Sequence, residues 1–130
     1  MSTRACYVFR DTNSTHVVYK HHDGYPSGAV QWIAAARANA WPFPRFEADE
    51  FAAAFVAANK AGPGGVRLVG NGDWRKIAPA DIEYVYDVHW GMVEAFAVSC
   101  DWGASEDWRT TWLFSHPLQD IENAPISELA

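Results

Sequence analysis

Alternating apolar and polar residues predict two strands at the N-terminus. Within residues 4–10 the alternation separates two faces, Ala5, Tyr7 and Phe9 on one and Arg4, Cys6, Val8 and Arg10 on the other. A period of two is typical of a strand. Residues 11–14 form a turn cluster of Asp, Thr, Asn and Ser. Residues 15–21 continue as a second strand, so the chain is expected to open with a hairpin.

Two helices are expected next. Residues 28–40 are rich in alanine and place their apolar positions near one face. Residues 47–60 carry acidic side chains in the first turn, which suits the helix dipole. The prolines of 41–44 separate the two helices because proline lacks the amide proton that a helix needs. The glycines of 62–65 end the second helix.

The remaining sequence predicts four more strands, at 66–69, 82–90, 92–100 and 108–115. The first two are joined by a long polar connection, and the last strand places Trp108, Thr110, Trp112 and Phe114 on one face. A short helical turn at most is expected after it. The order β-β-α-α-β-β-β-β indicates an α+β fold in a single domain, 1–130. We expect a mostly antiparallel sheet of five or six strands, with the two helices on one face.

Composition restricts the class of protein. The 130 residues are 49% hydrophobic and 20% charged, which is typical of a folded globule. No apolar run approaches the roughly 20 residues of a membrane span, and the N-terminus lacks the apolar core of a signal peptide. Cys6 and Cys100 make no CxxC pair and no disulfide framework, so a bacterial cytoplasm is the expected location. The acidic pI of about 5.2 argues against direct nucleic-acid binding.

Charge is distributed unevenly along the sequence. Residues 1–76 have a net charge of +3, whereas 77–130 have a net charge of −9 and hold four of the seven tryptophans. An acidic, aromatic surface is suited to a basic partner. The candidate partner-binding residues are Glu83, Asp87, Glu94, Trp102, Asp107 and Trp108. The alternative is a tryptophan-rich core beneath solvated acidic side chains.

A polar cluster ends the second strand and provides a candidate ligand site, formed by Lys20, His21, His22, Asp23 and Tyr25. Neighbouring histidines on a strand point to opposite faces, so we expect no metal site there. No cofactor is predicted either. A pairing of Cys6 or Cys100 with a histidine is disfavoured because a cysteine inside a strand is usually buried and inert. Asp87 and Glu94, as a carboxylate pair, are more typical of a solvated hairpin. No catalytic residue is therefore assigned.

The N-terminal motif is similar to one found in a family of small uncharacterised bacterial and phage proteins. It comprises Thr3-Arg4-Ala5 and the segment Tyr19-Lys20-His21-His22-Asp23-Gly24-Tyr25-Pro26-Ser27-Gly28, which resemble the family's TR[AS] and Y[KR]HxDGYPxG patterns. The resemblance covers about the first 30 residues. It implies a phage or prophage origin and supplies no catalytic residue.

Three functional hypotheses follow. The first is a non-enzymatic inhibitor that covers a basic surface of a host defence complex, as anti-CRISPR proteins do. The second is a protein that sequesters a nucleotide-like small molecule at the Lys20–Tyr25 cluster, close to a helix N-terminus that favours anions. The third is a small enzyme that uses His21, His22 and Asp23. A homodimer is a further expectation, because two-fold dimers are the commonest assembly.

Overall fold

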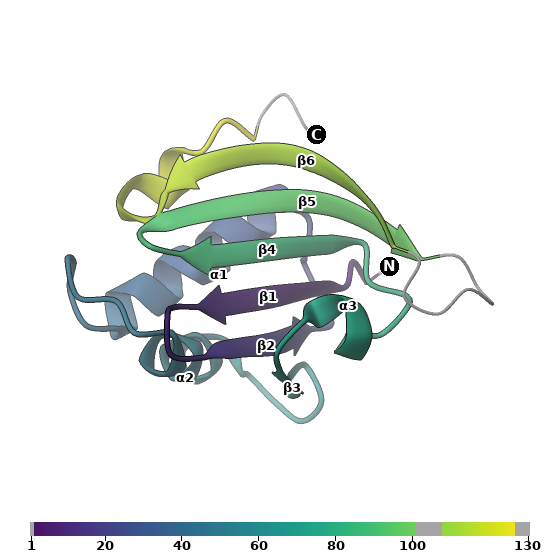
Figure 1. Cartoon of the computed structure of the whole chain (residues 1–130), viewed down its shortest axis with the longest axis horizontal. Helices are drawn as coiled ribbons and strands as arrows, with labels where there is room; N and C mark the ends of the chain where they lie inside the picture. The colour runs from purple at the N-terminus through teal and green to yellow at the C-terminus, as the bar shows by residue number, and fades with distance from the viewer. Residues whose placement is uncertain (1, 101–107, 127–130) are drawn as a thin grey trace.

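The computed structural model describes residues 2–100 and 108–126 and shows an α+β fold (Figure 1). This confirms the fold class predicted from the sequence. Its elements in chain order are β1 (Ala5–Arg10), β2 (Thr15–Lys20), α1 (Pro26–Asn39), α2 (Ala48–Asn59), β3 (Val66–Asn71), α3 (Trp74–Ile77), β4 (Tyr84–His89), β5 (Met92–Cys100), β6 (Trp108–Pro117) and the 3₁₀ helix η1 (Leu118–Asn123).

All six strands form one sheet, in the order β3-β2-β1-β4-β5-β6. Four of the five strand pairs are antiparallel. The exception is the central pair, in which β1 and β4 run parallel and Ala5 lies opposite Tyr84. The parallel pair joins the N-terminal hairpin to the C-terminal strands, with α1, α2 and β3 between them in the sequence. Residues from the two oppositely charged halves therefore lie side by side at the centre of the sheet.

The helices α1 and α2 cover one face of the sheet, whereas α3 lies on the other (Figure 1). Tyr7 and Phe9 of β1 point to the side of the two long helices, where Phe55 packs within 4.5 Å and 5.3 Å of their ring centroids. Cys6 and Val8 point to the opposite face, into a smaller core that includes Trp74 of α3. The two-faced alternation predicted for the first strand is thus confirmed.

Two parts of the fold differ from the sequence-based expectation. The helix α3 lies within the stretch expected to be a polar connection. The second difference is in β6, where the register with β5 shifts so that Trp112 pairs with Phe96 and Phe114 with Ala95. Phe114 joins the core under the long helices, and Trp108 packs on the opposite face. The expectation that these aromatic residues share one face is therefore wrong, because a bulge interrupts the period of two.

None of the helices in 2–100 and 108–126 is long and apolar enough to cross a bilayer.

Candidate functional site

A hollow on the described surface lies where β2 and β3 meet the end of α2. It has a volume of about 540 Å³. Its charged and polar walls come from Lys20, His21, His22, Asn59 and Arg67. The rest of the wall is the connection between α2 and β3, residues 61–66. We call this hollow the β2–β3 cleft. Its size is within the range of small-molecule sites, about 300–1,000 Å³.

Lys20 is the buried cation of this cleft. Only 7% of the residue is exposed, and its Nζ lies 4.2 Å from the centre of the Trp32 ring. Nζ also donates a hydrogen bond to the His22 carbonyl oxygen at 3.1 Å. Burial lowers the Lys20 pKa from its usual value because the ammonium group loses contact with water. The charge of Asp23 partly opposes this shift, but no carboxylate of the described residues lies at ion-pair distance from Lys20, which leaves its charge available to an anion.

His21 presents a defined hydrogen-bonding pattern. Its Nδ1 lies 2.6 Å from the Tyr19 hydroxyl and accepts a hydrogen bond from Arg4 Nε at 3.4 Å. Partial desolvation, followed by the electrostatic effect of Arg4 and His22, lowers the His21 pKa, which favours the neutral imidazole. Because guanidinium can only donate, Nδ1 is the acceptor and the proton resides on Nε2. The ring thus offers one N–H donor.

His22 and the glycine-rich connection complete the wall. His22 is exposed, its Nδ1 is 3.0 Å from the Ser2 hydroxyl, and its ring contacts the edge of His21 at 4.6 Å. The amide of His21 donates to the Gly65 carbonyl at 2.9 Å, which fixes the connection against β2. A Cβ at Gly62 or Gly65 would meet no atom within 4 Å, and neither has a positive φ. Neither glycine is required by local packing, so both leave room along the cleft.

The lining of the β2–β3 cleft has the chemistry that an anion would require. Its lining holds two cationic side chains, two imidazoles and one amide, and no carboxylate among the residues that the structure describes there. Arg67 lies over the Tyr19 ring at 4.7 Å, which orients its guanidinium. Charge-assisted hydrogen bonds to phosphate or carboxylate oxygens are the strongest interactions that such groups make.

The structure brings together three of the five residues predicted for a ligand site, and places the other two elsewhere. Asp23 is exposed with a φ of +56°, and its carbonyl accepts the Trp32 indole proton at 3.0 Å. Tyr25 caps α1 and is 42% exposed. Neither lines the cleft. Sequence reasoning missed Asn59 and Arg67, and it treated the glycines of 62–65 only as a helix stop.

The glycines of the N-terminal motif have structural roles. A Cβ at Gly24 would lie 2.7 Å from the Ala5 Cβ, and one at Gly28 would lie 2.4 Å from the Asp23 carbonyl oxygen. The Tyr86 hydroxyl donates to the Gly24 carbonyl at 2.5 Å. These contacts hold the turn against β1 and β4 and so fix the position of Lys20, His21 and His22 at the end of β2.

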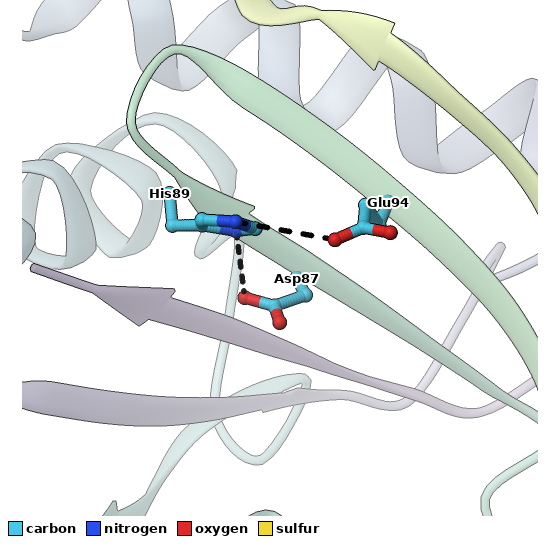
Figure 2. Close-up of side chains that lie close together, drawn as sticks. All are labelled: Asp87, His89 and Glu94. Carbon is cyan, nitrogen blue, oxygen red and sulfur yellow. Dashed lines mark ion pairs between the residues drawn. The ribbon is translucent and has the colours of Figure 1, made fainter.

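A second cluster of ionisable groups lies on β4 and β5 (Figure 2). His89 lies between two carboxylates, its Nδ1 3.5 Å from Asp87 Oδ1 and its Nε2 3.9 Å from Glu94 Oε1. Asp87 and Glu94 are directly opposite each other on neighbouring strands. One ligand atom from each residue lies within 4.8 Å of the others, a spacing that a metal ion could bridge.

Arg10 argues against a metal ion at this cluster. Its Nε donates to both Asp87 oxygens, at 2.9 Å and 3.1 Å. Its Nη2 lies 3.4 Å from both ring nitrogens of His89. The hydrogen bond to Asp87 raises the Arg10 pKa. A permanently charged guanidinium therefore occupies the position that a cation would take, and the cluster is a charge network across β1, β4 and β5.

Glu83 and Trp108, the described members of the remaining predicted partner-binding residues, are placed elsewhere. Glu83 is exposed just before β4. Trp108 packs edge-on against Trp74 at 5.0 Å and donates its indole proton to the Arg75 carbonyl at 2.9 Å, so it helps to fix α3 on the sheet. Trp102 and Asp107 lie outside the described residues.

Comparison with known proteins provides no family assignment. No protein-family model matches the chain, and no curated protein or solved structure matches it significantly.

Proposed function

We propose that the protein binds a small phosphate-bearing molecule in the β2–β3 cleft. The observation that carries the proposal is Lys20, a buried ammonium group with no described carboxylate at ion-pair distance and only the more distant charge of Asp23 to oppose it, in a cleft whose described walls are cationic or neutral. Burying a charge without a counter-ion is unfavourable. A bound phosphate supplies that counter-ion, and its ion pair with Lys20 is stronger because the ammonium group is shielded from water.

The proposed arrangement assigns a role to each wall. Lys20 and Arg67 provide the charge, and Arg67 adds a planar donor pair suited to phosphate oxygens. His21 Nε2 contributes a neutral donor, and so does the second proton of Asn59 Nδ2, whose first proton bonds the Trp32 carbonyl at 3.1 Å. The glycines at 62 and 65 admit close approach to the backbone, as glycine does in many anion sites. The volume of about 540 Å³ is large enough for a nucleotide.

The role that we propose is sequestration rather than catalysis. The described wall of the cleft contains no carboxylate, thiol or hydroxyl side chain to act as a base or nucleophile beside the imidazoles. With the phage or prophage origin that the N-terminal motif implies, a protein of this kind would remove a nucleotide signal from a host defence pathway. Turnover of the bound nucleotide would instead support an enzyme that uses His21 and His22.

The test is titration calorimetry with ATP and with inorganic pyrophosphate. We expect Lys20→Met to weaken binding about tenfold or more, since a charged hydrogen bond contributes about 1.5–3 kcal/mol. The methionine retains an apolar stem over Trp32. Lys76→Met is the matched control, because Lys76 is an exposed lysine on α3 outside the cleft. If Lys20→Met and wild type bind both probes equally, or wild type binds neither, the proposal fails.

The inhibitor hypothesis receives less support from the geometry. Asp87 is neutralised by Arg10, and Glu94 lies beside His89 and accepts from the Ser115 hydroxyl at 3.3 Å. An acidic face built on these two carboxylates would attract a basic partner only weakly. The inhibitor role stays a prediction, as does a homodimer.

A further inference from the structure

A second, smaller cleft lies at the opposite end of the strands. It is formed where the α1–α2 connection meets the β4–β5 turn, both at the left of Figure 1. Its volume is about 210 Å³, below the range typical of drug-sized ligands and of a size for one ring system. Its aromatic walls are Trp41, Phe43, Phe46 and Trp90.

The aromatic walls are exposed although they are large and apolar. Trp41 is 40% exposed, Phe43 62% and Trp90 68%. The Phe43 ring lies 3.8 Å from the position that a Cβ would take at Gly91, so the connection and the hairpin turn are in contact range. Single exposed aromatic residues are common on protein surfaces, whereas a group of exposed rings is typical of an interaction site.

Trp90 adds an independent observation. It forms a two-residue turn with Gly91, and both have positive φ, +49° and +75°. Positive φ at both positions is the pattern of a type I′ turn, in which asparagine followed by glycine is preferred. A bulky side chain in the left-handed region is strained. Trp90 therefore has a backbone conformation that is unfavourable for a tryptophan, and it is also the most exposed of the aromatic residues that line the cleft.

The polar lining defines the charge of the ligand. Arg37 and Arg45 line the cleft, and no carboxylate does so among the described residues. Arg37 is engaged by the Leu118 carbonyl and by Glu122. Arg45 lies over the Trp41 ring at 3.3 Å and donates to Glu47 through Nε alone, at 3.0 Å. The described contacts include no hydrogen bond from its Nη groups, which can therefore bind a ligand. Stacking on the indole holds them in place.

We propose that this cleft binds a planar aromatic ring that carries a carboxylate group. The ring stacks between the exposed aromatic walls, and the carboxylate accepts hydrogen bonds from the Arg45 Nη groups. This site is separate from the β2–β3 cleft and does not depend on the function proposed for it.

The test uses indole-3-acetate as the probe and 3-methylindole as its uncharged counterpart. The protein is labelled with 5-fluorotryptophan, and the ¹⁹F resonances are assigned by single Trp→Phe variants. We expect saturable shifts of the Trp41 and Trp90 resonances with indole-3-acetate and none at Trp112, which is 58% exposed elsewhere on the sheet. The uncharged probe is expected to bind about tenfold more weakly. Shifts that do not saturate, or equal binding of the two probes, overturn the proposal.

A substitution of Trp90 distinguishes a role in ligand binding from a role in stability. Trp90→Asn is expected to raise the melting temperature, because asparagine adopts positive φ readily, and to abolish the response of Trp41 to indole-3-acetate. Trp112→Asn, the matched control, should leave that response intact. A lower melting temperature for Trp90→Asn would show that Trp90 is retained for stability and would contradict the inference.

Discussion

Asp11 connects the first turn of the chain to the start of α2. One carboxylate oxygen accepts from the Asn13 and Ser14 amides, at 2.7 Å and 2.9 Å, and the other accepts from the Ala48 amide at 2.7 Å. Glu47, the residue at the N-cap position itself, makes no side-chain cap. A residue 37 positions earlier thus satisfies a free amide of the helix, a role that local sequence patterns do not reveal.

We predict that Asp11→Ala destabilises the protein by about 1 kcal/mol at pH 6, the usual effect of losing a cap. The three backbone hydrogen bonds lower the Asp11 pKa, that from Ala48 most. A lowered pKa means that the stabilisation is complete above the unfolded value, near 3.9, and disappears as the pH falls through the folded value. The melting temperatures of wild type and Asp11→Ala should therefore converge as the pH falls below about 4. Thr12→Ala, at an exposed neighbour, should match wild type throughout; a constant difference at all pH values would contradict the electrostatic account.

Cys6 lies in the smaller core, where the sequence predicted a buried and unreactive thiol. The residue is fully buried, and burial followed by the charge of Asp81 raises its pKa to about 12. We predict that in a Cys100→Ser variant the Cys6 thiol resists modification by iodoacetamide at pH 8 until the protein is unfolded with urea. Rapid labelling of the folded variant would contradict this burial and reopen a nucleophilic role.

At the scale of the element, the 3₁₀ helix η1 contributes to the core in a way that the hydrophobic periodicity of the sequence does not predict. The sequence predicts at most a short helical turn after 117, because Pro117 and Pro125 leave little pattern. In the structure η1 buries Leu118 and Ile121 in the main core, and the Arg37 guanidinium on α1 pairs with Glu122. This pair lowers the Glu122 pKa to about 2. These side chains are buried by tertiary contacts with α1, and such contacts cannot be predicted from the pattern of a six-residue segment.

We predict that Ile121→Ala destabilises the protein by about 2–4 kcal/mol, in the range of large-to-small core substitutions. Ile121 has no exposed surface, although it lies near the end of the described chain. Urea denaturation measures the change, and Gln119→Ala, at an exposed position of η1, should alter stability by less than about 0.5 kcal/mol. Equal stability of the two variants would show that η1 is dispensable to the core.

The longer elements were predictable because their patterns extend over many residues. Both hairpin strands and both long helices lie within two residues of the predicted bounds. The strand β4 also alternates as expected, with Tyr84 and Tyr86 facing the long helices and Val85 the opposite core. The same reasoning assigned the aromatic residues of β6 to one face and was wrong there. A single extra residue forms a bulge, and a bulge reverses the face of every residue beyond it. The β2–β3 cleft was predicted only in part, since Arg67 and Asn59 reach it from β3 and α2.

At the scale of the whole molecule, the charge asymmetry of the sequence is reduced by the topology. The parallel pairing places Arg10 of the basic half beside Asp87 of the acidic half, and Arg4 lies 3.4 Å from Asp81. Arg37 and Glu122 make a third pair between the halves. Sequence alone does not show which strands are neighbours, so a net charge of −9 in 77–130 does not by itself define a negative surface.

This redistribution gives different predictions for two charge reversals in the acidic half. Asp87→Lys should destabilise the protein by about 1–3 kcal/mol, because it removes a half-buried partner of Arg10 and places a like charge beside it. Glu83→Lys, at an exposed position, should change stability by less than about 0.5 kcal/mol. Urea denaturation of both variants in low salt measures the difference. If instead the two reversals are equally mild, Arg10 does not depend on Asp87, and the carboxylates of β4 and β5 are free to form the acidic interface that the inhibitor hypothesis requires.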